Sequence, residues 1–268
     1  MGRFYRDQII TKSIMVGDRV TNIEVIDKDG NVKISEDTPV NAVAAKFEIP
    51  AAVIALLAND DIIAVDGVAF TKASSAETGN NWTNAASLAT KINALTNWDA
   101  VESGGKVTVT AAVKGKAQNG KAITVSMVDA TTASGGENAK STATIAAESL
   151  AQVSVGDVIE FADTELVKAA VTDAEKGEFA DATGLATCLG AIDGWDAAVS
   201  DNDVVITAAE NGDNDGEIVT ITLYRVTASG EDGTLANKGD VRFDSGYIYV
   251  AIADNTISDA NWKKAALS

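Results

Sequence analysis

DIIAVDGVAFTKA, residues 61–73, and DVIEFADTELVKA, residues 157–169, are two versions of one pattern within a chain of 268 residues. In the first version, Asp66 and Gly67 stand between two short apolar runs. This dipeptide favours a two-residue hairpin turn, because both residues tolerate the positive φ angles that such a turn requires. The pattern therefore predicts a β-hairpin at each of the two places.

Each expected hairpin is followed by the same succession of signals. Apolar residues recur at helical spacing, which predicts a helix with one buried face; they are Ala85, Leu88, Ala89, Ile92 and Leu95, and then Ala182, Leu185, Ala186, Leu189 and Ile192. A Trp-Asp-Ala triplet follows, at Trp98 and again at Trp195. Two alternating runs come next in each case, as expected for half-buried strands. The order and spacing indicate an internal duplication.

The expected fold class is α+β, with two tandem copies of a small ββαββ module, in which one helix lies on the face of a sheet, and with β-rich ends. The expected divisions are an N-terminal β segment (1–50), a first repeat (51–128), a linker (129–149), a second repeat (150–226) and a C-terminal β meander (227–268). The repeats are called the first and second segment below. Around Asp29 and Gly30, further strands and a turn are expected. Trp98 and Trp195 are expected to close the core between helix and sheet.

The net charge of the chain limits the kinds of molecule that it is expected to bind. The chain has 39 acidic and 21 basic residues, a net charge of −18. Such a field repels phosphate backbones, so nucleic acid is not expected as a partner. The excess is uneven: residues 61–127 hold 5 acidic and 6 basic side chains (+1), whereas residues 157–223 hold 16 acidic and 2 basic (−14). General solubility is one explanation; the other is that the neutral window faces neighbours and the acidic one faces solvent.

Composition also argues against the common catalytic chemistries. The chain has no histidine and a single cysteine, Cys188. Histidine is the usual general base near neutral pH and the commonest transition-metal ligand. Cys188 lies on the apolar side of an expected helix, so buried packing is expected of it. No enzyme activity and no cofactor are expected.

Two acidic patterns are candidate sites. Residues 211–216 resemble the first half of a calcium-binding loop, but the twelfth position holds Thr222 in place of glutamate, so a solvated turn is expected. Many carboxylates are present, yet no pair stands in the apolar setting that glycoside hydrolysis requires. The expectation is therefore no catalytic, no cofactor-binding and no metal site.

No membrane span or signal peptide is expected. The apolar stretch at residues 42–58 contains Lys46, Glu48 and Pro50 and is shorter than the ~20 residues that a span needs. The first residues lack the apolar run of a signal peptide.

Two stretches resemble known families. IIAVDGVAF, SLATKIN and KVTVTA are similar to the repeat of flagellins and hook-associated proteins, with the Leu-Ala-x-x-Ile-Asn motif at residues 88–93 but without its Ile-Asn at 189–190. The C-terminal KGDVRFDSGYIYVAIADNTISDANWKKAAL, residues 238–267, resembles a segment that ends many phage structural proteins. It carries four additional residues at 257–260. Flagellins have long heptad-patterned helices at both ends, which this chain lacks, so the resemblance favours phage virion proteins.

The resemblance implies a non-catalytic virion structural protein, a capsid decoration or head-fibre subunit that acts by assembly. The alternatives are a phage tail subunit (tube, baseplate or fibre) and a carbohydrate-binding adhesin. The implied partners are copies of the chain itself and major capsid or other virion proteins, with no nucleic acid and no membrane. The implied location is the virion, assembled in the host cytoplasm.

Overall fold

The structure is a computed structural model that describes residues 8–10, 25–27, 34–36, 39, 41–75, 78–135, 137–212, 216–226, 230–244, 246–254, 256 and 262–266. It is a mixed α+β, strand-rich fold with several sheets, which confirms the expected fold class at that level. The chain divides into two compact units: Met1–Lys46, Thr110–Asn119 and Ala228–Ser268 form the first, and Phe47–Val109 and Gly120–Thr227 form the second.

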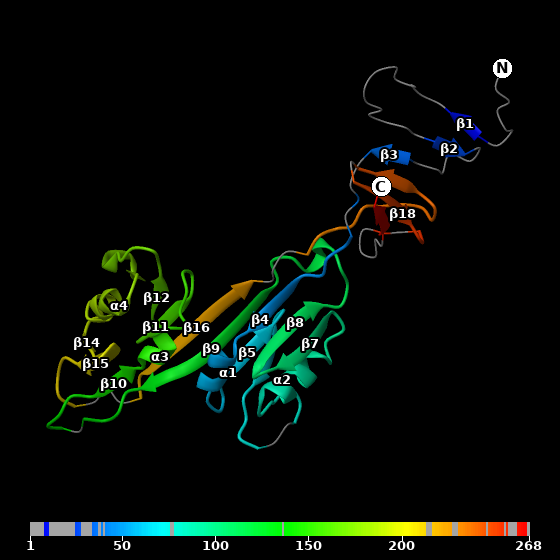
Figure 1. The fold of residues 1–268 in the computed structure, drawn as a ribbon. Helices are drawn as coiled ribbons and strands as arrows, with labels where there is room; N and C mark the ends of the chain where they lie inside the picture. The colour runs from blue at the N-terminus through cyan, green and yellow to red at the C-terminus, as the bar shows by residue number, and fades with distance from the viewer. Residues whose placement is uncertain are drawn as a thin grey trace. The chain divides into compact units, whose positions relative to one another are not determined.

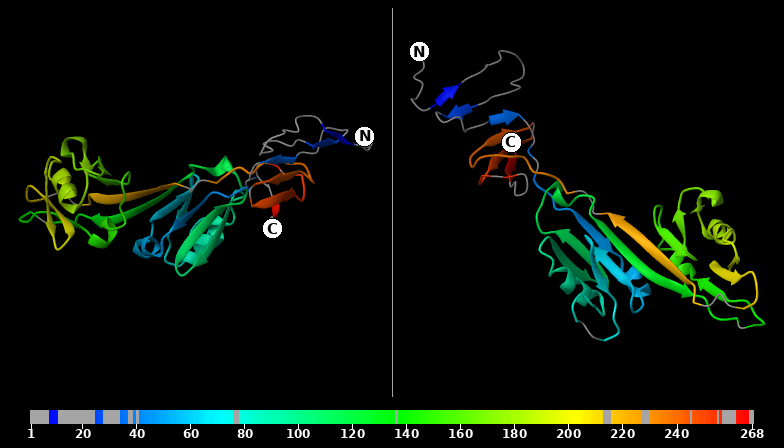
Figure 2. Two further views of the ribbon diagram at one scale, coloured as in Figure 1. Left: turned by 45° about the horizontal axis from the view of Figure 1, so that its top comes forward. Right: turned by 180° about the vertical axis from the view of Figure 1, so that it is seen from behind.

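A seven-stranded sheet organises the second unit (Figure 1). Its strands, in spatial order, are β13 (Glu178–Phe179), β12 (Thr164–Lys168), β11 (Val158–Phe161), β16 (Ile218–Val226), β9 (Ala122–Thr131), β5 (Ile62–Val65) and β6 (Val68–Thr71). All neighbours are antiparallel except the parallel pair β12–β13. The long strands β9 and β16 lie side by side in Figure 2 and join the hairpins of the two segments into one sheet.

Two three-stranded sheets and four α-helices complete this unit. The sheets are β4 (Lys46–Ile49), β8 (Lys106–Ala111) and β7 (Trp98–Ser103), and β10 (Thr142–Ile145), β15 (Asp203–Ala208) and β14 (Trp195–Ser200). The helices are α1 (Ala51–Leu56), α2 (Ala85–Ile92), α3 (Ala147–Leu150) and α4 (Ala182–Leu189), with a 3₁₀ turn η2 (Ala174–Lys176). Side-chain caps begin the two longer helices: Asn84 accepts from the Ser87 amide and Asp181 from the Gly184 amide.

The expected hairpins and helices are present. Asp66 and Gly67 have φ angles of 49° and 81° and connect β5 to β6, with Val65 opposite Val68. The turn between β11 and β12 uses Ala162 and Asp163, at φ angles of 46° and 57°, without a glycine. Leu88 and Leu185 are fully buried on the expected faces of α2 and α4.

Alternating side chains of the seven-stranded sheet form the core of the second unit. Buried residues of this inner face are Ile63, Val65, Phe70, Ile123, Val125, Met127, Ile159, Phe161, Leu166, Ile221 and Leu223. The two tryptophans pack edge-on against a phenylalanine, Trp98 against Phe47 at 5.8 Å and Trp195 against Phe161 at 4.8 Å between ring centroids. Both tryptophans are buried, as expected for residues that close the core.

Residues 129–149 are not a linker throughout. They contain the end of β9, all of β10 and the start of α3, and they belong to the same compact unit as residues 47–109 and 150–226. The polar composition of this stretch suggested a connector, but alternating Ala143 and Ile145 bury their side chains while Thr142 and Thr144 stay exposed. β10 pairs with β15 in an antiparallel arrangement.

The first unit contains a four-stranded sheet in the order β19 (Trp262–Ala266), β18 (Tyr247–Ala251), β17 (Val241–Phe243) and β3 (Ile34–Glu36). β1 (Gln8–Ile10) pairs with β2 (Val25–Asp27), and η1 (Lys116–Gln118) is a 3₁₀ turn. The small core comprises Ala42, Tyr249, Ala251 and Trp262. The expected turn at Asp29 and Gly30 lies outside the described residues.

Candidate functional site

Two buried aspartates hold equivalent places at the start of the two hairpins. Asp61 is 3% exposed and Asp157 is 1% exposed. Asp61 accepts hydrogen bonds from the amides of Val128 (2.9 Å) and Ala58 (2.6 Å). Asp157 accepts from the amides of Tyr224 (2.6 Å) and Ser154 (2.7 Å). Each carboxylate therefore ties the entry of its hairpin to the neighbouring long strand.

Arg225 distinguishes the second of these sites. Its Nη1 atom donates to both oxygens of Asp157, at 2.8 and 2.9 Å, and its Nη2 atom donates to the Gln152 carbonyl at 2.9 Å. The Arg225 side chain is 28% exposed, so the ion pair is only partly shielded from water. The Asp157 carboxylate thus accepts hydrogen bonds from two amides and one guanidinium, and these donors stabilise it in the interior.

Asp129 occupies the position on β9 that Arg225 occupies on β16. Its carboxylate accepts from the Ser149 hydroxyl and, at 3.0 Å, from the Ala146 amide, both at the start of α3. Asp203 accepts from the Ala147 amide at 2.8 Å in the same turn. These two aspartates satisfy amides at the beginning of α3 that lack partners within the helix.

Burial raises the pKa of two of these carboxyl groups, Asp61 and Asp129. It raises the pKa of Asp61 above its usual 3.8, because desolvation of the charge outweighs the stabilising amides of Val128 and Ala58. The pKa of Asp129 is raised for the same reason, against the opposing effect of the Ser149 hydrogen bond. Both carboxylates are engaged by hydrogen bonds from within the chain.

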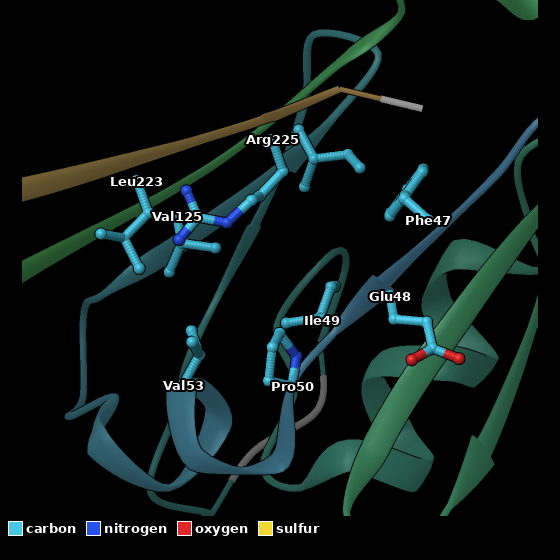
Figure 3. A pocket seen from close by; sticks show the side chains of 9 residues that line it. Phe47, Glu48, Ile49, Pro50, Val53, Val125, Leu223 and Arg225 are labelled. Carbon is cyan, nitrogen blue, oxygen red and sulfur yellow. The ribbon is translucent and has the colours of Figure 1, made fainter. Parts of the chain in front are cut away.

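An apolar pocket lies beneath Arg225, between strands β9 and β16 and the segment formed by β4 and α1 (Figure 3). Arg225, Leu223 and Val125 project into it from one side, and Pro50 and Val53 from the other. Its free volume is about 10 Å³, which is room for about one water molecule. The pocket is thus a packing gap too small for an organic ligand.

Cys188 is buried, as expected. Its Sγ atom donates to the Glu178 carbonyl at 3.4 Å. Burial raises the pKa of the thiol, with Asp173 adding to the effect. A thiol held in this form is a poor nucleophile, and the side chain serves as packing on α4.

The other residues named from the sequence are not brought together. Trp98 and Trp195 begin β7 and β14, each in its own three-stranded sheet. The acidic loop at 211–216 falls partly outside the described residues. Sequence reasoning missed Asp61, Asp157 and Arg225 as interior groups; the available signal was an aspartate at the same point before both hairpins.

Across the ranges given above, no group of three or more cysteine or acidic side chains is arranged to hold a metal ion. No helix in the described part of the chain has the length and hydropathy to cross a membrane. Comparison with protein-family models, with curated proteins and with solved structures finds no match.

Proposed function

We propose that this chain is a non-catalytic virion structural protein with two tandem copies of a ββαββ module, and that it acts by assembly as a capsid decoration or head-fibre subunit. The order of elements supports the duplication. β5, β6, α2, β7, β8 and β9 are followed later by β11, β12, α4, β14, β15 and β16. The preceding strand and helix also correspond, because β4 and α1 begin 96 residues before β10 and α3.

The C-terminal meander carries the proposal. Strands β17, β18 and β19 form a sheet in the first unit, whereas most of the first segment and all of the second belong to the other unit. One face holds the core residues Tyr249, Ala251 and Trp262. The opposite face carries Ile248 and Val250, which are 38% and 37% exposed. Lys263 lies opposite Val250 on this face, and exposed apolar side chains beside a single lysine are suited to docking on another protein.

Two buried carboxylates and one half-buried carboxylate support a non-catalytic role. Asp61, Asp129 and Asp157 each accept at least two hydrogen bonds from fixed donors. A general acid or base needs access to a substrate proton, and these groups are instead engaged in holding strands and a helix start.

Particle incorporation tests the proposal. A chain ending at Asn237, and the variants Ile248→Glu and Val250→Glu, should fail to co-sediment with particles, while Val171→Glu, at a site 74% exposed in the second unit, should be incorporated normally. Normal incorporation of the truncated chain would contradict the proposal. Hundreds of copies per particle on capsids indicate decoration, and tens of copies on tails indicate a tail subunit. Glycan binding by the isolated chain without incorporation indicates an adhesin.

A further inference from the structure

The seven-stranded sheet has an outer face, defined here by the side chains that alternate with the buried inner row. Three cross-strand rows follow from the registers. The central row is Thr71, Ile62, Ser126, Thr222, Val158 and Val167. The neutral row is Ala69, Ala64, Thr124 and Tyr224. The acidic row is Val128, Thr220, Glu160 and Glu165. All of these side chains are half-buried or exposed.

The neutral and acidic rows occupy corresponding positions in the two segments. Ala64 and Ala69 face each other across β5 and β6, and Glu160 and Glu165 face each other across β11 and β12. The fold therefore accommodates a pair of glutamates at this place, although like charges directly opposite are mildly unfavourable. The first segment has two small uncharged residues there, so charge is absent from this half of the face.

The uncharged half also exposes large apolar side chains. Tyr224 is 48% exposed and Ile62 is 37% exposed. Tyrosine is one of the residue types that anchor protein interfaces. In a chain with a net charge of −18, a surface of ten central and neutral positions without a single charge is suited to contact with another protein.

We propose that the central and neutral rows of the outer face pack against the same face of a second copy of this chain. Charge selects this occupant. A basic partner would gain most from the carboxylates of the second segment, whereas an acidic partner requires a contact without charge. A second copy is such an acidic partner. Sheets pack face to face at about 10 Å, and the small side chains of Ala64 and Ala69 permit that approach.

The inference rests on the proposed function, because self-contact is one way in which a virion subunit assembles. The proposed contact also predicts how the association of two chains depends on salt concentration. The contact itself contains no ion pairs, while the remainder of the two chains repels, so added salt should screen the repulsion and strengthen association. An interface that is based on ion pairs would weaken instead.

Sedimentation velocity of the purified full chain, across a concentration series at low and high salt, tests this contact. The wild-type chain should dimerise, more tightly at high salt. Ala64→Glu with Ala69→Glu gives the first segment the pair that the second already carries, and it should weaken dimerisation at least tenfold. Tyr224→Thr, which adds no charge, should weaken it as well and provides a second test if the double variant folds poorly.

Two matched controls complete the design. Val101→Glu with Val171→Glu adds the same two charges at exposed sites outside the outer face, and should leave dimerisation unchanged. Glu160→Ala with Glu165→Ala should not weaken it. A monomeric wild-type chain, a dimer that tolerates both face variants, or equal loss in the controls would each overturn the contact. A monomer that still enters particles would overturn this inference and leave the proposed function standing.

Discussion

Ser126 and Thr222 lie directly opposite each other on β9 and β16, with their hydroxyl oxygens 3.3 Å apart, and they are 96 residues apart in the sequence. The pairs on either side are reciprocal: Val125 faces Leu223, and Met127 faces Ile221. At the same offset of 96 residues, Ile221 corresponds to Val125 and Leu223 corresponds to Met127. Val125 therefore pairs with the counterpart of Met127, and Met127 pairs with the counterpart of Val125, so exchanging the two strands gives the same set of pairs. The junction between the two segments has local two-fold symmetry, as in an isologous dimer.

This junction predicts that the two segments do not separate when the chain is cut. Trypsin cleavage at Lys140, in the connection between β9 and β10, should leave both fragments bound through the nine residue pairs of β9 and β16. Native size-exclusion chromatography should show one species of unchanged size, and denaturing electrophoresis should show two fragments. Two separately eluting folded fragments would contradict the prediction.

Arg225→Met should destabilise the chain by about 1.5–3 kcal/mol, because the buried carboxylate of Asp157 loses its charged donor but keeps two amides. Urea unfolding at neutral pH measures the change in the free energy of unfolding. Lys121→Met is the control, since it breaks the more exposed pair with Asp66 and should cost no more than about 1 kcal/mol. Equal losses in the free energy of unfolding of the two variants would show that the burial of Asp157 does not strengthen its ion pair with Arg225.

Asp61→Asn should have a pH-dependent effect on stability. Because burial raises the pKa of Asp61 in the folded chain, the folded state binds this proton more tightly than the unfolded state. The contribution of Asp61 to stability is therefore fully present below its usual pKa and declines as pH rises through the raised value. Urea unfolding should show a larger loss for Asp61→Asn near pH 4 than at neutral pH.

Asp173→Asn is the control for that experiment, and its pH dependence has the opposite sign. The exposed Lys176 ammonium lowers the pKa of Asp173, so its contribution is present at neutral pH and is lost as pH falls through the lowered value. The same direction of change for both variants would refute the assignment of desolvation as the cause at Asp61.

Trp98→Ala should cost about 3–5 kcal/mol, as a large-to-small change in a packed core, and Trp195→Ala should cost a similar amount. Trp98→Phe should cost clearly less than Trp98→Ala. The ring contact with Phe47 is largely retained, and the Trp98 Nε1 atom, which is buried without a hydrogen-bond partner, is removed. Thermal and urea unfolding measure both changes. A variant of full stability would contradict a core role for that tryptophan.

Local elements could be predicted from the sequence, and long-range pairing could not. Asp66 and Gly67 specify their turn through backbone preference alone, and the leucines of α2 and α4 specify a buried face through spacing. The pairing of β9 with β16 joins residues 96 positions apart, and alternation within a strand does not identify its neighbour. The strand β10 within the stretch 129–149 has no clear sequence signal, because threonine and alanine are common both in connectors and in strands.

The interior carboxylates were missed for a related reason. Aspartate is almost never fully buried unless it is paired, and only one of the two amide donors of Asp61 and of Asp157 lies three residues away, whereas the other is 67 residues away. Arg225, by contrast, lies near Asp157 only because β16 returns beside β11. Neither relationship leaves a local signal in the sequence.

The β9–β16 pairing also bears on how the chain avoids uncontrolled polymerisation. An unpaired strand edge offers a row of amides and carbonyls to any passing chain and is a common origin of aggregation. Here each long strand covers the open edge of the other, so nine residues of potentially adhesive backbone on each side are satisfied within one molecule. A recombinant chain cut to either segment alone would expose that edge, whereas in the intact chain the margins of this sheet, as far as the structure describes it, are the short strands β6 and β13.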